Sequence, residues 1–278
     1  MSCSDVDELE TPTGPVLAGL RVGGTQLYSV NALASGYAIR YPGLCEFRVS
    51  ADARRVSCLI GPECNEGLVA VLLTGTITAF LLVLRGYAVL HGSAVLWQGS
   101  TVVFVGPAGS GKTTVAALCC AAGAQLVNDD VIPLATSPDG VVCVGLASEL
   151  RLRHAASAIV ELFPTAPKTR GTPDGRLGLL APEAQTESNA VSAVVLPRPT
   201  RGASHLTTRR LVPSLALEEL LANVRVPGET GPPFQAKRFL TVADLAATVP
   251  VMEAEIPWGP PFRTDLVSQL FDAVVRPG

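Results

Sequence analysis

The clearest chemical pattern in the chain is a glycine-rich segment from Gly106 to Thr113. It reads Gly-Pro-Ala-Gly-Ser-Gly-Lys-Thr and satisfies G-x-x-x-x-G-K-[ST] at every fixed position. Glycines let several backbone N–H groups converge, and a helix that starts there adds its positive end, so such a loop favours a polyphosphate. Lys112 would then contact the β- and γ-phosphates, and the Thr113 hydroxyl would bind Mg²⁺. A glycine-rich turn without a ligand is the alternative interpretation.

Lysine is scarce in this sequence, which makes its presence in the motif informative. The chain has 21 Lys and Arg residues, and its only lysines are Lys112, Lys168 and Lys237. Arginine supplies almost every other positive charge, so the lysine of the motif calls for a chemical reason, and phosphate binding provides one. We therefore predict that the motif binds a nucleotide, and the residues leave the choice between ATP and GTP open. The predicted nucleotide-binding residues are Gly106, Pro107, Ala108, Gly109, Ser110, Gly111, Lys112, Thr113 and Thr114.

Two adjacent carboxylates, Asp129 and Asp130, follow the motif after one predicted helix and one predicted strand. Neighbouring side chains at the end of a strand point to opposite sides, so one carboxylate could face a metal and the other an incoming hydroxyl. A turn with a helix cap is the alternative interpretation of this pair. His91 lies upstream, in a predicted strand whose far end adjoins the motif, where it could orient or tune a carboxylate. A structural histidine is the alternative there.

Apolar runs and turn signals predict the elements that hold these residues. Two β-rich runs, Tyr87 to Leu96 and Thr101 to Val105, flank a hairpin turn at Trp97-Gln98-Gly99-Ser100. An Ala-, Leu- and Cys-rich helix over residues 112–122 follows the motif and ends at a glycine. A strand over residues 124–127 then leads to the acid pair. The order strand, loop, helix, strand predicts an α/β fold and gives the motif the context that its chemistry requires.

The C-terminal half shows a less regular pattern. Ser137 to Gly140 is typical of a hairpin turn. The polar segment Pro164 to Asn189 contains several Pro and Gly residues and predicts a mobile loop. A strand over residues 190–196 and helices over 214–223 and 264–275 complete the prediction.

The N-terminal part has a different pattern. Residues 15 to 60 alternate short apolar runs with turn signals, which is typical of a small, mostly antiparallel β unit. Gly67 to Leu84 follows without a charge, and its 18 residues reach the lower limit for a membrane span. Threonines make this run less apolar, and only single charges flank it. Both features favour a helix packed on a sheet over a membrane span. We predict a small β-rich unit over residues 1–65 and a P-loop domain over residues 66–278.

The composition excludes several classes of protein. Of the 278 residues, 48% are hydrophobic and 16% are charged, and a net charge of −3 does not indicate disorder. An isoelectric point near 5.7 disfavours nucleic-acid binding. The seven cysteines are odd in number and lack a C-x-x-C pair, and Met1 to Glu10 is not a secretory signal, so we expect a cytoplasmic location. We also expect no nucleic-acid partner, no membrane span and a homo-oligomer.

Several of these segments together resemble a known family. Leu90-His91-Gly92-Ser93-Ala94-Val95, the hairpin turn, the glycine-rich motif and the segment from Gly123 to Asp130 resemble, in order and spacing, the catalytic domain of HPr kinase/phosphorylase. They are more similar still to HPr-kinase-like enzymes of peptide-modifying gene clusters, including lasso peptide kinases. The similarity covers about Leu81 to Arg153, roughly a quarter of the chain. It implies an α/β P-loop kinase core of the HPr kinase C-terminal domain type. The implied activity is phosphorylation of a serine-type hydroxyl on a protein or peptide, with ATP and Mg²⁺.

The resemblance also implies roles for individual residues. In that family the second Asp of the pair is the proton acceptor and the upstream His supports it, which are the places of Asp130 and His91 here. The metal-binding Glu of the family stands in an E-[IL]-R run, which Glu149-Leu150-Arg151 matches. An exposed strand residue is the alternative for Glu149. The implied catalytic residues are Asp130, His91 and Lys112, and the implied metal ligands are Thr113, Asp129 and Glu149.

Other features depart from the family or leave a choice open. No segment matches the loop that the family uses in dephosphorylation, so phosphorylase activity is not expected. Arg209 and Arg210 could supply the late arginine that contacts phosphate, although a solvated pair is favoured. Lys168 and Arg170 could instead reach the phosphates when the polar segment closes. A kinase for a small hydroxyl compound and a nucleotide-binding regulator with little or no transferase activity are the alternative functions.

Overall fold

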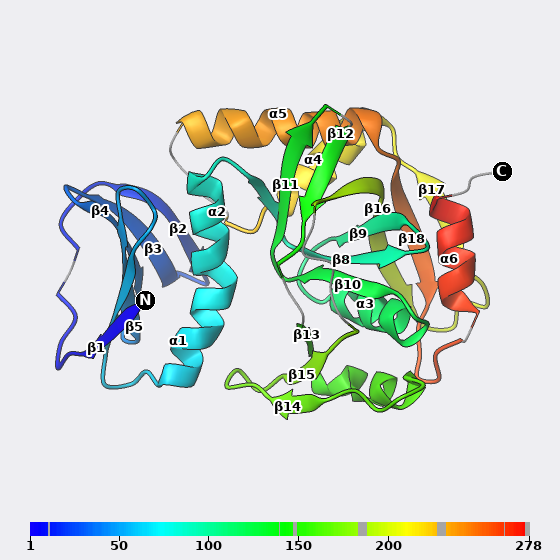
Figure 1. Cartoon of the computed structure of the whole chain (residues 1–278), viewed down its shortest axis with the longest axis horizontal. Coiled ribbons are helices and arrows are strands. Elements are labelled where there is room, and N and C mark those ends of the chain that lie inside the picture. The colour runs from blue at the N-terminus through cyan, green and yellow to red at the C-terminus, as the bar shows by residue number, and fades with distance from the viewer. Residues whose placement is uncertain are drawn as a thin grey trace. The chain divides into compact units, whose positions relative to one another are not determined.

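The computed structural model describes residues 1–10, 12–138, 140–146, 149–182, 188–226, 232–263 and 265–275. These residues form a mixed α/β structure with three sheets (Figure 1). The helices are α1 (Glu66–Leu72), α2 (Thr78–Leu84), α3 (Lys112–Ala121), α4 (Pro213–Ala222), α5 (Pro232–Thr248) and α6 (Leu266–Val275), with a π-helical turn η1 (Leu73–Ile77) and a 3₁₀ helix η2 (His154–Leu162). The strands are β1 (Ser2–Asp5), β2 (Val16–Val22), β3 (Thr25–Leu33), β4 (Gly36–Tyr41), β5 (Cys45–Ser50), β6 (Val56–Ile60), β7 (Ala88–Leu90), β8 (Gly92–Trp97), β9 (Ser100–Val105), β10 (Gln125–Asp129), β11 (Ile132–Ser137), β12 (Gly140–Val144), β13 (Glu149–Leu152), β14 (Thr169–Gly171), β15 (Leu177–Leu180), β16 (Ser188–Thr200), β17 (Thr207–Arg210) and β18 (Val251–Pro257).

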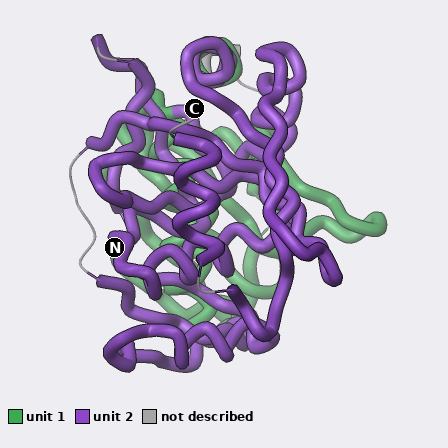
Figure 2. Tube along the Cα trace, turned by 90° about the vertical axis from the view of Figure 1, so that its right-hand side faces the viewer, with its two compact units in different colours: residues 1–87, 226–238 green, residues 88–225, 239–278 purple. Residues whose placement is uncertain are grey.

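The chain divides into two compact units, which Figure 2 colours separately. The first comprises residues 1–87 and 226–238, and the second comprises residues 88–225 and 239–278. This division differs from the predicted ranges 1–65 and 66–278, because the helix after residue 65 belongs with the N-terminal sheet. Phe80 of α2 lies edge to face against Tyr37 of β4, with the ring centroids 5.4 Å apart.

The first unit contains a six-stranded sheet in the order β1-β6-β5-β4-β3-β2. The strands from β2 to β6 are antiparallel neighbours, as the turn signals over residues 15–60 predict. Strand β1 was not predicted, because its short sequence Ser-Cys-Ser-Asp has no alternation of apolar and polar residues. It forms by pairing in parallel with β6, so that Cys3 lies opposite Cys58.

The apolar stretch Glu66–Leu84 is helical throughout, with a π-helical turn in its middle. The Asn65 side chain caps its start by accepting a hydrogen bond from the Leu68 N–H at 2.8 Å. The hydroxyls of Thr74 and Thr78 donate to backbone carbonyls of the preceding turn. This stretch has a mean hydropathy of 2.4, and among the described residues it alone is long and apolar enough to cross a membrane. A core helix passes the same test, and 39% of its apolar window is buried.

The second unit is built on a nine-stranded sheet, in which β9 lies between β8 and β16. On one side of β9 the order continues from β8 to β10, and on the other side β16 pairs with β18. Strands β9, β10, β16 and β18 run in the same direction, so their carboxyl ends meet at one edge of the sheet. In open α/β sheets this edge is where ligands bind.

Strand β9 separates two hydrophobic cores, because its side chains alternate between the faces of the sheet. Val102 and Phe104 belong to the core that α3, α6 and η2 cover. Val103 and Val105 belong to the core that α4 and α5 cover together with β11 and β12 (Figure 1). Burial on both faces explains why the sequence of this strand contains a continuous apolar run rather than alternating apolar and polar residues.

The polar segment after residue 164 differs from the loop predicted there. It contains β14 and β15, which pair with β13 in a small three-stranded sheet. Residues 183–187 of this segment lie outside the described part of the chain. Helix α5 and strands β17 and β18 were also missed. These elements depend on contacts with distant partners, since β18 pairs with β16 and α5 contributes to the core of the second unit.

Candidate active site

A tight loop joins the end of β9 to the start of α3, as the glycine-rich motif predicts. Gly109 and Gly111 adopt φ values of +88° and +85°, which other residues rarely reach. A Cβ atom on Gly111 would also lie 2.7 Å from the indole ring of Trp258. Conformation and close approach both require glycine at this position. The loop therefore turns tightly and leads directly into the first turn of α3, whose N–H groups lack partners within the helix.

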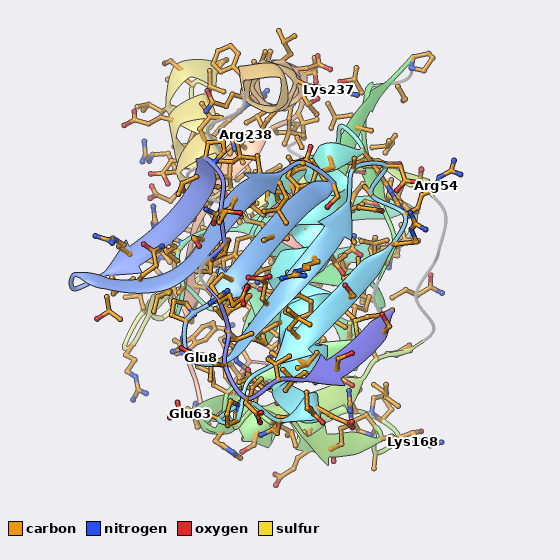
Figure 3. All side chains as sticks on the ribbon, turned by 90° about the vertical axis from the view of Figure 1, so that its left-hand side faces the viewer. Glu8, Arg54, Glu63, Lys168, Lys237 and Arg238 are labelled. Atoms are coloured by element: carbon orange, nitrogen blue, oxygen red, sulfur yellow. The ribbon has the colours of Figure 1, made fainter. Side chains whose placement is uncertain are left out.

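Lys112 is the first residue of α3 and its side chain is only 6% exposed. Its Nζ atom donates hydrogen bonds to the carbonyl oxygens of Gly106 at 2.7 Å and Pro107 at 2.8 Å. Burial lowers the pKa of Lys112 to about 8. The nearby carboxylates act in the opposite direction but only partly offset this shift. The other two lysines, Lys168 and Lys237, are exposed, and Figure 3 labels both. Lys112 is thus the one lysine held in a low-dielectric site beside the loop.

A second feature of the loop fits an anionic ligand. The Ser110 hydroxyl oxygen is buried, and it has no hydrogen-bond partner among the described residues. An unpaired buried hydroxyl is costly, so such a group calls for a partner. A phosphate oxygen held by this loop would accept a hydrogen bond from the Ser110 hydroxyl, in keeping with the predicted nucleotide-binding range.

Asp129 ends β10 and is held by three donors. Its Oδ1 atom accepts hydrogen bonds from the hydroxyls of Ser93 at 2.6 Å and Thr113 at 2.9 Å. Its Oδ2 atom accepts one from the backbone N–H of Arg151 at 3.0 Å. Burial raises the pKa of Asp129 from its usual value, whereas the hydrogen bonds from Ser93 and Arg151 oppose that shift. The carboxylate is therefore fixed in orientation and touches the predicted nucleotide loop directly.

Asp130 follows with a backbone φ of +70°, an uncommon conformation for a residue other than glycine. His91 Nδ1 lies 3.2 Å from Asp130 Oδ1 and 3.3 Å from the Asp130 backbone oxygen. Both are acceptors, so Nδ1 carries the proton. Arg225 Nη2 lies 2.8 Å from Asp130 Oδ2. Burial raises the pKa of Asp130, but the bonds from His91 and Arg225 outweigh it and hold that pKa well below its usual range.

The position of His91 differs from the prediction, and Arg225 was missed. The predicted strand over residues 87–96 is split into β7 and β8, and His91 is the residue between them. The segment around Arg225 lies alongside, because the His91 N–H donates to the Asn223 carbonyl at 2.8 Å and the Arg225 N–H donates to the Val89 carbonyl at 2.9 Å. No sequence signal marks Arg225, since 95 residues separate it from Asp130.

These groups open into one cavity of about 250 Å³ in the second unit. The loop lines it with Lys112 and Thr113, and the acid pair and His91 line it as well. Four arginines also line the cavity, namely Arg151, Arg153, Arg176 and Arg201. The guanidinium of Arg153 reaches the loop, where its Nη1 atom lies 3.9 Å from the position of a Cβ on Gly109. The arginines give the cavity an excess of positive charge suited to a polyphosphate.

Glu149 and the cations singled out in the sequence lie elsewhere. Arg170 donates to the Glu149 carboxylate at 2.8 Å, and neither residue is among the described residues that line the cavity. Arg209 pairs with Glu253 at 2.6 Å and is 65% exposed, in keeping with the solvated pair favoured from the sequence. The structure therefore brings Asp129, Asp130, His91, Lys112 and Thr113 together and leaves Glu149 bound to Arg170. A metal role for Glu149 stays a prediction.

The donors at the acid pair fit a hard divalent cation. Thr113 and Asp129 offer oxygen atoms 2.9 Å apart, and Mg²⁺ binds through one or two protein oxygens together with phosphates and water. Among the described residues no group of three or more His, Cys, Asp or Glu side chains could hold a metal ion. Thr113 and Asp129 could thus supply two ligands to a cation that takes its other ligands from a bound molecule and water, and the described residues form no metal cage of their own.

Comparison with known proteins gives a distant structural likeness. No family model matches the chain, and no curated protein matches its sequence. A search of solved structures finds the Hpr(Ser) kinase/phosphatase from Coxiella burnetii, at 13% sequence identity and a TM-score of 0.32. The match covers 68% of this chain and 93% of the other. At this identity and TM-score the likeness is distant.

Proposed function

We propose that this chain is an ATP-dependent kinase with a P-loop core, which transfers the γ-phosphate to a serine-type hydroxyl of a protein or peptide. One observation carries the proposal: the glycine-rich loop, the buried Lys112 and the acid pair all open into the same cavity. Phosphoryl transfer needs a phosphate cradle and a carboxylate beside the attacking oxygen, and the residues that line this cavity are of the types that could supply both. The proposal includes the HPr-kinase-like character that the sequence motifs imply.

The loop and its cations would bind the triphosphate. Backbone N–H groups of the loop and the Ser110 hydroxyl would donate to phosphate oxygens. Lys112 would exchange the two loop carbonyls that it now contacts for oxygens of the β- and γ-phosphates. Thr113 and Asp129 would hold Mg²⁺, which supplies neutralisation of the phosphate charge when it is bound. Arg153 stands close enough to the loop to add a further positive charge.

Asp130 would orient the attacking hydroxyl and accept its proton. Its low pKa means that the carboxylate is ionised at neutral pH, so it is always ready to accept a hydrogen bond. A carboxylate of low basicity contributes mainly by position, which suits a transfer in which most of the rate comes from alignment and charge. His91 and Arg225 fix that position from two sides, since each contacts a different oxygen of Asp130.

The test is the transfer of label from γ-labelled ATP. The protein is incubated with Mg²⁺ and a serine-containing peptide, with free serine, or with buffer alone. We expect label on the peptide only. Label on free serine would favour a small-molecule kinase, and release of phosphate alone would favour a nucleotide-binding regulator. A Lys112→Met variant is the control, because it keeps the loop backbone and removes the charge that contacts phosphate. Transfer at full rate by this variant would contradict the proposal.

A further inference from the structure

The proposed phosphate site accounts for only part of the cavity. The remaining wall comes from the ends of β16 and β18, and it carries Arg201, Trp258 and Phe262. The two rings lie edge to face with their centroids 5.6 Å apart. Both side chains are partly buried against the core of the second unit and partly open to the cavity. Neither the loop chemistry nor the acid pair uses this aromatic wall.

The sheet order places the aromatic wall and the acid pair on opposite sides of the loop. Asp129 ends β10, two strands from β9 on one side, and Trp258 follows β18, two strands from β9 on the other. At about 4.8 Å between neighbouring strands, these two strands lie about 19 Å apart. The contacts of the loop agree, because Gly111 faces Trp258 whereas Thr113 contacts Asp129. The nucleotide loop thus lies between a polar end and an aromatic end.

This arrangement fixes the direction in which a nucleoside triphosphate can lie. Its terminal phosphate must reach Asp130, so the rest of the molecule must extend away from that end. The first wall that it meets on the other side of the loop is Trp258, whose backbone N–H donates to the Thr200 carbonyl at 3.1 Å and so anchors the residue to the end of β16. A flat base can stack on an indole ring, and every nucleobase presents such a face.

Arg201 adds a polar group to the same wall. It follows Thr200 directly and lines the cavity, and among the described residues it has no ion-pair partner. A guanidinium beside aromatic rings can donate to base or ribose oxygens and can also stack. The wall therefore combines a stacking surface with an available donor.

We propose that Trp258, Phe262 and Arg201 form the nucleobase subsite of this cavity, with the base stacked on Trp258. This inference rests on the proposed function, because it takes the triphosphate to be bound by the loop. It assigns the aromatic end to the nucleotide and leaves the acid end to the acceptor.

The test compares ATP with inorganic tripolyphosphate, which has the three phosphates and no base. Dissociation constants for both are measured calorimetrically with Mg²⁺ on the full chain and on Trp258→Ala. In the unchanged protein we expect ATP to bind about tenfold more tightly than tripolyphosphate, the equivalent of one stacked base. In Trp258→Ala the two should bind about equally, with the affinity for tripolyphosphate unchanged.

A fluorescence experiment tests the same point without altering Trp258. The chain has two tryptophans, and the other one, Trp97, lies beside Phe271 with ring centroids 5.7 Å apart and does not line the cavity. A Trp97→Phe variant therefore leaves Trp258 as the sole reporter. We expect ATP to quench its emission at a concentration that matches the dissociation constant, and tripolyphosphate at saturation to leave most of the emission.

The outcomes separate this inference from the proposed function. If Trp258→Ala keeps the preference for ATP, or if tripolyphosphate quenches Trp258 as strongly as ATP does, the base does not stack there and the inference is overturned while phosphate binding stands. If the variant instead loses affinity for a peptide acceptor and keeps that preference, the aromatic end belongs to the acceptor, which also overturns it. If neither ATP nor tripolyphosphate binds the unchanged protein, both proposals fail.

Discussion

The two ends of the cavity hold their side chains by different means. At the acid end, Asp129 accepts hydrogen bonds from three groups and Asp130 lies between His91 and Arg225. At the aromatic end, Trp258 is held mainly by packing. Groups that take part in a reaction must be fixed in position and charge, whereas a subsite for a flat ring needs contact area. This is the difference expected if, as proposed, phosphoryl transfer occurs at the acid end and the base binds at the aromatic end.

The strongest test of this comparison is the loss of one carboxylate. Asp130→Asn keeps the shape of the side chain but removes the charge that would orient the hydroxyl. We expect the transfer rate to fall about 10³-fold, within the range for general acid–base residues, and the ATP dissociation constant to change less than about threefold. Steady-state kinetics and calorimetry measure the two quantities. Asp272→Asn, an exposed carboxylate on α6, is the matched control and should change neither.

Arg225 should affect the acid end through Asp130. Arg225→Leu removes the contact at 2.8 Å, so we expect the transfer rate to fall about 10- to 100-fold with little change in ATP affinity. Because Arg225 lowers the pKa of Asp130, its loss should raise that pKa and move the acidic limb of the pH–rate profile to higher pH. Arg225→Lys should restore part of both effects. A slower variant with an unmoved acidic limb would mean that Arg225 does not act through Asp130.

Lys112 lies between the two ends, and its titration should affect binding of any phosphate ligand. Its pKa is lowered to about 8 by burial, so the free protein loses this charge as the pH rises through that value. Anions prefer the protonated amine, and we expect the affinity for tripolyphosphate and ATP alike to fall about tenfold between pH 7 and pH 9. Calorimetry across this range measures it. Lys112→Arg, whose guanidinium stays charged, should lack this alkaline weakening whatever its affinity at pH 7.

The smallest effect is expected at Glu149. Because this carboxylate is bound to Arg170, Glu149→Gln should change the Mg²⁺ concentration for half-maximal transfer by less than about threefold. Asp129→Asn, in contrast, should raise that concentration at least about tenfold, since Asp129 contacts Thr113 at the loop. A Mg²⁺ titration of transfer activity compares the two. An equal effect of both substitutions would support Glu149 as a metal ligand, the role that the sequence resemblance implies.

Much of the site could be predicted from the sequence because its key residues are close in the chain. The loop, helix α3 and strand β10 follow one another between Gly106 and Asp129, so local signals suffice: glycines, an apolar strand and a helix end. The same signals located the hairpin turn at Trp97 to Ser100, where Gln98 and Gly99 have positive φ values. Glu149 lies beyond these elements. Its side chain pairs with Arg170 of β14, and no local sequence pattern indicated that strand.

The sequence by itself determined the glycine-rich loop and the order of the acid pair, since turn geometry and helix formation depend on neighbouring residues. Only the tertiary structure decided which distant groups join them. Arg225 reaches Asp130 because its segment lies beside β7, and Trp258 reaches the loop because β18 pairs with β16. Strand pairing across long separations depends on burial of whole elements, which a short sequence pattern does not encode.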